Sequence, residues 1–284
     1  MTRLIALIDG SNYSGSVCDH AAWVAGRTDA SVEILHVLGR RDVSSEPANL
    51  SGAIGLGART ALLEELAELD AQKAKLSQKR GRMILEDAKQ RLGAAGVAEV
   101  STRLRNGDIV ETIQEFKHDA DLIVVGKRGE AADFAKLHLG SNLERVVRSS
   151  HKPVLVAARA FKPVERFLIA FDGGPSARKA VEHIARGSLL RGLECRMLMV
   201  GTDTAEARSQ LDDAADLLRA GGYTVNADIE QGQADDAIAK RVETDDINLV
   251  VMGAYGHSRI RSLIIGSTTT EMVRSCKVPV MLFR

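Results

Sequence analysis

NLVVMGAYGHSRIRSLIIGSTTTEMVRSCKVPVMLF, residues 248–283, is the stretch of the sequence that most strongly indicates the fold. It opens with an apolar run typical of a strand buried on both faces, and this run leads into a loop with glycines at 253, 256 and 266. Ser267 follows the last glycine and begins a segment with helical periodicity, after which a second apolar run, PVMLF, ends the pattern. The order strand, glycine loop, helix and strand is typical of a parallel α/β sheet.

The same pattern occurs in the first half of the chain, so the sequence contains an internal repeat. Asp9 and Asp172 close equivalent apolar runs 163 residues apart, whereas Gly126 and Gly253 are 127 residues apart. The first copy is therefore 163 − 127 = 36 residues longer between these points. The matching segments are 3–12 with 166–175, 119–129 with 245–256, and 137–157 with 263–283.

Each copy alternates apolar runs with helical segments in the order β-α-β-α-β-α-β-α-β. In the second copy the expected strands are FLIAF, CRMLMV, TVNADIE, LVVMG and PVMLF. This alternation predicts an α/β fold with two tandem doubly wound open parallel sheets, each of five strands. We expect one domain at 1–158 and a second at 164–284, with a linker in 157–165.

The additional residues of the first copy lie mainly in 40–80. Here a loop-like stretch precedes GARTALLEELAELDAQKAKLSQKRGRMILEDAKQRLGAAG, residues 57–96, which has the pattern of a long amphipathic helix with a break near Gly81. One interpretation is a lengthened helix that covers the sheet. The other is a lid or a partner-binding arm, because a helix of this length can present an apolar stripe to another subunit.

Composition narrows the possible partners. Lys plus Arg and Asp plus Glu both number 38, and aromatic residues make up only 4%, so we expect neither nucleic acid nor an anionic membrane as partner. Cys18, Cys195 and Cys276 are too far apart for a metal motif and odd in number, which indicates reduced thiols. The apolar run Leu4 to Ile8 is too short for a signal peptide or a membrane span, so we expect a cytoplasmic protein.

The glycine loop of the second copy has the chemistry of an anion site. Gly253 and Gly256 let the backbone come close to phosphate oxygens, and Gly266 and Ser267 lie at the start of a helix, where free N–H groups and the positive dipole end attract anions. An equally open interpretation is that the glycines only turn the chain and Ser267 only caps the helix. The loop matches neither the Walker A pattern nor G-x-G-x-x-G.

The motif Gly253-x2-Gly256-x9-Gly266-Ser267, after LVVM and before a helix, resembles the nucleotide-binding signature of the universal stress proteins. The aspartate that follows FLIAF fits the same family, and the resemblance covers both halves apart from about 40–80. It implies two tandem domains with the adenine nucleotide alpha hydrolase-like fold, paired through their last strands. It also implies that the second half binds an adenine nucleotide, either ATP, ADP or AMP, which can carry Mg²⁺ with it. The residues implied in this binding are Ala170, Phe171, Asp172, Val200, Met252, Gly253, Tyr255, Gly256, Gly266, Ser267, Thr268 and Thr269.

Within that set the resemblance gives each group a part of the nucleotide. The residues that end the first two strands hold the adenine, the residues from Met252 to Gly256 line the ribose and phosphate path, and the start of the last helix holds the phosphates. The first copy departs from the motif, with a ten-residue spacer and with Asn142 and Leu143 in place of Thr268 and Thr269. Its corresponding candidates are Asp9, Val37, Gly126, Arg128, Gly129, Gly140, Ser141 and Asn142.

No arrangement of catalytic side chains is recognisable, and the seven histidines have no metal-ligand spacing, so we expect neither catalytic nor metal-ligating residues. The leading hypothesis is an ATP-binding stress-response regulator with at most slow ATP hydrolysis, acting as a homo-oligomer or as an intramolecular pseudo-dimer. The alternative is a scaffold of the same fold that binds a protein partner without nucleotide. A third hypothesis is an enzyme of the wider nucleotide-binding α/β group, such as an adenylating enzyme or an electron-transfer flavoprotein-like module.

Overall fold

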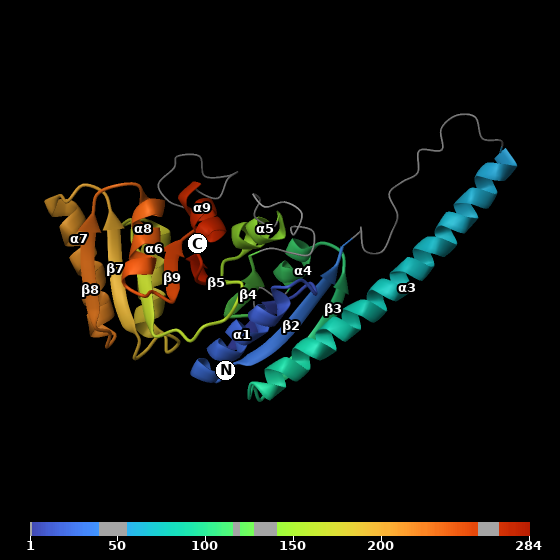
Figure 1. Ribbon diagram of the computed structural model, residues 1–284, viewed down its shortest axis with the longest axis horizontal. Helices are drawn as coiled ribbons and strands as arrows, with labels where there is room; N and C mark the ends of the chain where they lie inside the picture. The colour runs from blue at the N-terminus through green and yellow to red at the C-terminus, as the bar shows by residue number, and fades with distance from the viewer. Residues whose placement is uncertain (1, 40–55, 116–119, 128–140, 255–266) are drawn as a thin grey trace.

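The computed structural model describes residues 2–39, 56–115, 120–127, 141–254 and 267–284 (Figure 1). Strands and helices alternate along both halves of the chain, as the repeat predicts. The strands are β1 Arg3–Leu7, β2 Ser31–Leu38, β3 Val100–Asn106, β4 Leu122–Gly126, β5 Val154–Ala157, β6 Arg166–Ala170, β7 Glu194–Val200, β8 Val225–Glu230, β9 Leu249–Gly253 and β10 Val280–Phe283. The helices are α1 Ser14–Thr28, α3 Leu56–Ala94, α4 Ile109–Glu115, α5 Ser141–Ser149, α6 Pro175–Arg186, α7 Ala205–Ala220, α8 Ala234–Thr244 and α9 Ser267–Ser275.

The strands of both halves form one sheet of ten, in the order β3-β2-β1-β4-β5-β10-β9-β6-β7-β8. Neighbouring strands are parallel within each half, whereas β5 and β10 pair antiparallel, with Leu155 opposite Met281. The α/β fold with five parallel strands in each half is confirmed, and so is the expectation that the last strands meet. The order of the second half mirrors that of the first across this junction, which gives the chain a pseudo-twofold arrangement.

The central strands are apolar because helices cover both of their faces. Along β9, Leu249 and Val251 belong to one hydrophobic cluster and Val250 and Met252 to the other, on the opposite side of the sheet. All four side chains are buried. An uninterrupted apolar run is therefore what a central parallel strand requires, and the run LVVM meets that requirement.

Several hydrogen bonds tie the two halves together besides the strand pairing. The guanidinium of Arg27 in α1 donates to the carbonyl oxygens of Leu189 and Arg191, both at 2.5 Å. The buried ammonium of Lys127, just after β4, donates to the carbonyl of Cys276 in the second half. The halves thus share polar contacts as well as a sheet.

Helix α3 is continuous over 39 residues, so the prediction of a break near Gly81 is wrong. A Cβ at Gly81 would lie 2.8 Å from Leu104 Cδ1 and 3.0 Å from His36 Cδ2, which shows that glycine here allows the helix to pack closely against β2 and β3. The carboxyl-terminal part of α3 buries Leu85 and Leu92 in the core, while its amino-terminal part projects beyond the body (Figure 1).

Candidate functional site

Three apolar side chains line one face of the sheet at the carboxyl ends of adjacent strands in the second half. Ala170 ends β6 and is in register with Met252 of β9, and Val200 ends the neighbouring strand β7. All three belong to, or pack against, the same hydrophobic cluster, and Ala170 and Val200 are only partly buried. Such a platform at the carboxyl edge of a doubly wound sheet is where ligands of this fold class bind, and its apolar surface suits a planar base.

Phe171 and Gly253 lie next to this platform, but their positions face the other side of the sheet. The Phe171 side chain is buried in the opposite cluster, so it offers the crevice only its backbone. A Cβ at Gly253 would lie 3.0 Å from Ser176 Cβ and 3.2 Å from the backbone nitrogen of Ala177, at the start of α6. Close packing of α6 therefore accounts for a glycine at this position.

The loop after β6 is shaped by Asp172. Its Oδ1 accepts a hydrogen bond from the Gly174 backbone N–H at 2.9 Å, and Gly173 between them has a φ of +70°, which favours glycine. Helix α6 then begins at Pro175, whose fixed φ suits a first helical position. The carboxylate of Asp172 is exposed, so it is within reach of a ligand in the crevice.

The amino-terminal end of α9 is held against the end of β9 by Thr269. This side chain is 4% exposed, and its hydroxyl donates to the carbonyl oxygens of Gly253 and Ala254, both at 3.4 Å. The equivalent residue of the first half, Leu143, is also buried. The position therefore anchors the helix in both halves. Of the other candidates, Tyr255, Gly256 and Gly266 and the side chains of Ser267 and Thr268 lie outside the described residues.

The first half repeats the platform with a larger side chain at its centre. Leu7 ends β1 in register with Val125 of β4, and Val37 lies on β2, all on the same face. Leu7 takes the place of Ala170, so this crevice is narrower at the centre of the platform. After β1, the Oδ1 of Asp9 accepts from the Ser11 backbone N–H at 3.0 Å, as Asp172 does in the second half.

The remaining first-half candidates are only partly described. Gly126 ends β4, and Asn142 is an exposed residue of α5. Arg128, Gly129, Gly140 and the side chain of Ser141 lie outside the described residues. The structure thus brings Asp9, Val37 and Gly126 to the carboxyl edge, as the repeat predicts.

A second acidic residue at the same edge, Asp108, follows β3 and is held by an ion pair with Arg145. Burial raises its pKa, but the hydrogen bonds from Arg145 and from the backbone N–H groups of Val110 and Glu111 outweigh that effect, and the pKa is lowered overall. The Arg145 guanidinium is 2.6 Å away. Within the residues that the structure describes, no group of three or more His, Cys, Asp or Glu side chains could hold a metal ion.

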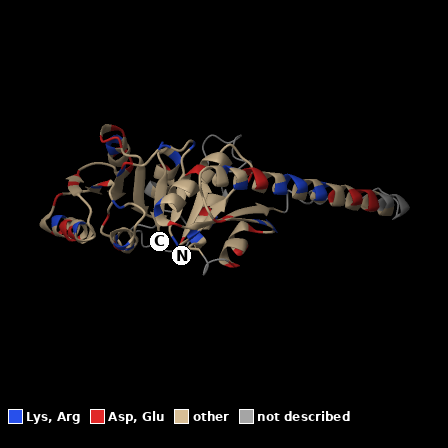
Figure 2. Cartoon of the chain, turned by 90° about the horizontal axis from the view of Figure 1, so that it is seen from below, with Lys and Arg blue, Asp and Glu red and all other residues tan. Residues whose placement is uncertain are grey.

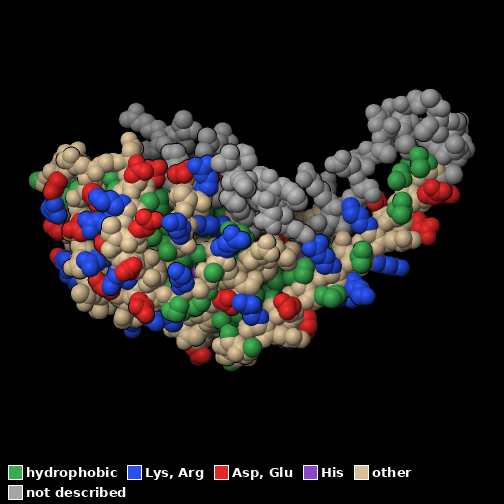
Figure 3. All heavy atoms as spheres, in the orientation of Figure 1, with side chains coloured by type: hydrophobic (Ala, Val, Ile, Leu, Met, Phe, Trp, Pro, Cys, Tyr) green, Lys and Arg blue, Asp and Glu red, His purple; other side chains and the backbone are tan. Residues whose placement is uncertain are grey.

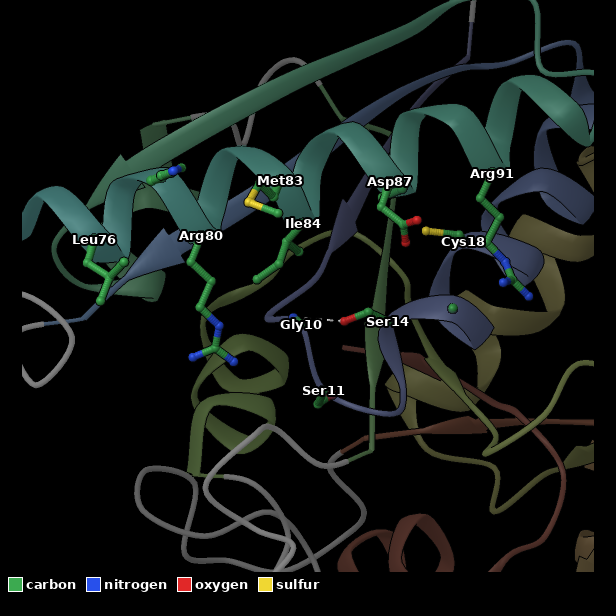
Figure 4. A pocket seen from close by; sticks show the side chains of 13 residues that line it. Gly10, Ser11, Ser14, Cys18, Leu76, Arg80, Met83, Ile84, Asp87 and Arg91 are labelled. Carbon is green, nitrogen blue, oxygen red and sulfur yellow. Dashed lines mark hydrogen bonds between the residues drawn. The ribbon is translucent and has the colours of Figure 1, made fainter.

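Sequence reasoning missed a groove that α3 forms over the loop after β1. It has a volume of about 610 Å³, and Gly10, Ser11 and Ser14 line one side while Leu76, Met83 and Ile84 line the other (Figure 4). A Cβ at Gly10 would lie 2.5 Å from Ile84 Cδ1, so α3 rests directly on this loop. No local signal predicts such packing, because the two segments are about 70 residues apart in the sequence.

Known proteins share this architecture along the whole chain. The universal stress protein Slr1230 of Synechocystis sp. is 37% identical over 287 residues that span all of both chains. The crystal structure of a universal stress protein from Archaeoglobus fulgidus superposes with a TM-score of 0.74 at 22% identity, covering 99% of this chain and 98% of that one. A structure described as a putative universal stress protein from Pseudomonas aeruginosa superposes with a TM-score of 0.64 at 18% identity, covering 100% and 93%.

Among the helices of the described ranges, none combines the length and the apolar character that crossing a membrane requires.

A model of the universal stress protein family matches residues 1–158 and matches again at residues 163–284. Two family matches, a ten-stranded sheet with the repeated five-strand order, and a full-length relative agree. The chain therefore belongs to the universal stress protein family, with two units of the family in tandem.

Proposed function

We propose that the protein is a regulator that binds an adenine nucleotide, preferentially ATP. The nucleotide would lie in a crevice at the carboxyl edge of the second half of the sheet. The observation that carries this proposal is the apolar platform of Ala170, Val200 and Met252 at the carboxyl edge of β6, β7 and β9. The base would lie against this platform, and Asp172 would reach the ribose. The start of α9, with Ser267 and Thr268, would supply backbone N–H groups to the phosphates.

The difference between the two platforms supports placing the nucleotide in the second half. Ala170 is a small residue at the centre of its platform, whereas the first half has Leu7 there, and Leu7 is 5% exposed. The larger side chain occupies space that a base would need. Binding of one nucleotide per chain is therefore the expected stoichiometry, with the domains divided near 158–164 and the first unit as structural partner.

Regulation rather than catalysis fits the chemistry of the described residues. A hydrolase needs a base positioned on the attacking water, and Asp172, the carboxylate that follows β6 beside the platform, instead holds its own loop by accepting a hydrogen bond from the Gly174 backbone N–H. Any Mg²⁺ would arrive with the phosphates, since hard cations prefer oxygen ligands. ADP or AMP would use the same base and ribose contacts, so ligand preference depends on the phosphate end.

The test is extraction of nucleotide from the purified protein with identification by chromatography, followed by calorimetric titration with ATP, ADP and AMP. Ala170→Leu, which copies the first half, should reduce affinity at least about tenfold by filling the platform. Ala170→Ser keeps the small volume and serves as matched control. Full affinity in Ala170→Leu, or no heat with any nucleotide in the unmodified protein, would reject the proposal.

The second candidate is a scaffold that binds a protein partner without nucleotide. The projecting part of α3 favours it, because this part exposes large apolar side chains outside the body of the protein. Deletion of residues 56–75 should then abolish binding of the protein partner, and titration of the unmodified protein with ATP, ADP or AMP should give no heat, whereas the regulator gives heat with at least one of them.

A further inference from the structure

Large apolar side chains are exposed along one stripe of α3. Leu69, Leu76 and Met83 are 57%, 68% and 65% exposed, and Leu62, which is partly exposed, continues the series at the same interval of seven residues. Apolar side chains recur along the projecting helix in Figure 3. Of the five large hydrophobic side chains that are exposed within the described ranges, four belong to this helix. An interval of seven keeps these side chains on one face of the helix, as it keeps one of the two apolar positions of each heptad in helices that pack side by side. The positions between them are mostly polar, for example Gln72 and Lys79, so charge has to contribute to any contact along this face.

Charge divides the same part of α3 into two blocks of equal length. Residues 60–71 contain four acidic and no basic side chains, and residues 72–83 contain five basic and no acidic ones. Figure 2 shows the basic block in the middle of the projecting helix and the acidic block toward its free end. The acidic side chains are Glu64, Glu65, Glu68 and Asp70, and the basic ones are Lys73, Lys75, Lys79, Arg80 and Arg82.

We propose that the projecting part of α3 pairs antiparallel with the same segment of a second copy of this chain. With Leu69 of one copy opposite Leu76 of the other, Leu62 meets Met83 by the same count. This register also places the acidic block of each copy on the basic block of its partner. It sets Glu65 opposite Arg80 and Asp70 opposite Lys75.

The same charges disfavour parallel pairing in register, because it would lay acid on acid and base on base along the contact. A membrane surface is a poor fit for the stripe, since membrane-binding amphipathic helices carry mostly basic residues on their polar face and this one has an acidic half. A second copy has the complementary charge pattern by symmetry. The paired segment 62–83 would be about 33 Å long at 1.5 Å per residue.

The groove at the base of the helix is continuous with the proposed contact. Leu76 and Met83 belong both to the stripe and to the groove wall, and in Figure 4 Leu76, Arg80 and Ile84 lie on the same side of α3 as the loop that holds Gly10. In the antiparallel register, the Leu62 end of the partner helix reaches Met83. The groove therefore receives the tip of the second copy.

Sedimentation velocity of the full chain over a wide concentration range tests the pairing. The unmodified protein should form a dimer, and Leu69→Gln combined with Leu76→Gln should raise the dissociation constant at least about hundredfold, because four leucines leave the contact. Ala67→Gln combined with Ala71→Gln is the matched control, since both alanines are exposed on the opposite face and should leave the dimer intact. Circular dichroism of each variant verifies folding.

Disulfide trapping tests the orientation. Leu62→Cys and Met83→Cys proteins, each alone and then mixed, are oxidised with diamide, which removes two hydrogens for each disulfide formed. Cys18, Cys195 and Cys276 are buried and free, so they give little background. The mixed disulfide should dominate, and its yield should fall at high salt, which screens the charge blocks that bring the two helices together. A monomer at all concentrations, a dimer unaffected by the leucine changes, or disulfides formed mainly between like positions would overturn the proposal.

Discussion

Replacing Gly253 with alanine should destabilise the second half by overpacking. The added Cβ would lie 3.0 Å from Ser176 Cβ and 3.2 Å from the Ala177 backbone nitrogen, both in the first turn of α6. Ordinary carbon contacts are about 3.5–4.0 Å. Because Ala177 is 1% exposed and its backbone is part of a helix, the strain cannot be relieved by rotating a side chain.

The start of α6 therefore has to move by a few tenths of an ångström, away from a close-packed sheet. Overpacking of this kind costs about 1–3 kcal/mol. For a unit of this size, each kcal/mol lowers the melting temperature by about 2–4 °C, so the expected decrease is about 2–12 °C. Gly253→Val should cost more, since two further carbons enter the same space.

Thermal unfolding followed by circular dichroism measures the effect, with Gly26→Ala as the control. Gly26 lies inside α1, and nothing lies within 4 Å of the Cβ that alanine would add. This control should be stabilised by about 0.5–1 kcal/mol, because alanine loses less backbone entropy in a helix than glycine does. An unchanged melting temperature in Gly253→Ala would show that packing against α6 does not require this glycine. Close approach of a ligand to the backbone would then be the better explanation for it.

Two further predictions concern titratable groups. Burial lowers the pKa of His20 and of His183, so the unfolded state binds more protons below about pH 6.5 and stability should fall as the pH decreases from 7 to 5; a urea midpoint that is the same at both pH values contradicts this. Burial also raises the pKa of the Cys18 thiol to about 11 and of the Cys195 thiol to about 12, so both should resist a thiol reagent near pH 8 until the protein unfolds, and rapid labelling of the native protein would refute the burial argument.

The strands could be predicted from the sequence because long apolar runs carry their own signal. A short run such as LVVM, rich in β-branched residues and followed by glycine, is typical of a strand covered on both faces, and the internal repeat then extends that interpretation to the other half. The meeting of β5 with β10 followed from the family resemblance, not from periodicity. Local patterns were sufficient here because each strand is buried as a unit.

The glycines were harder to interpret, because the same residue serves opposite purposes. Gly81 has the composition signal of a helix break, yet it lies inside α3 and allows close approach to Leu104 and His36. Gly253 has the signal of a phosphate loop, and its position is explained by contact with α6. Both roles depend on long-range neighbours, and neither neighbour is visible in the surrounding sequence. The buried ammonium of Lys127 likewise contacts a carbonyl, that of Cys276, which is far away in the sequence, so the residues around Lys127 do not predict this contact.

The two halves share a scaffold but differ in what covers the loop after the first strand. In the second half, Gln210 of α7 lies over Gly173, and in the first half Ile84 of α3 lies over Gly10. The group that covers this loop is therefore a polar amide in the second half and an apolar isoleucine in the first half. The helix that covers the loop in the first half, α3, also carries the exposed stripe that contains Leu69 and Leu76. One long helix in the first half thus has two effects: it covers the loop after β1, and it carries the surface that we propose for self-assembly, whereas the shorter α7 of the second half covers only its own loop, the one after β6.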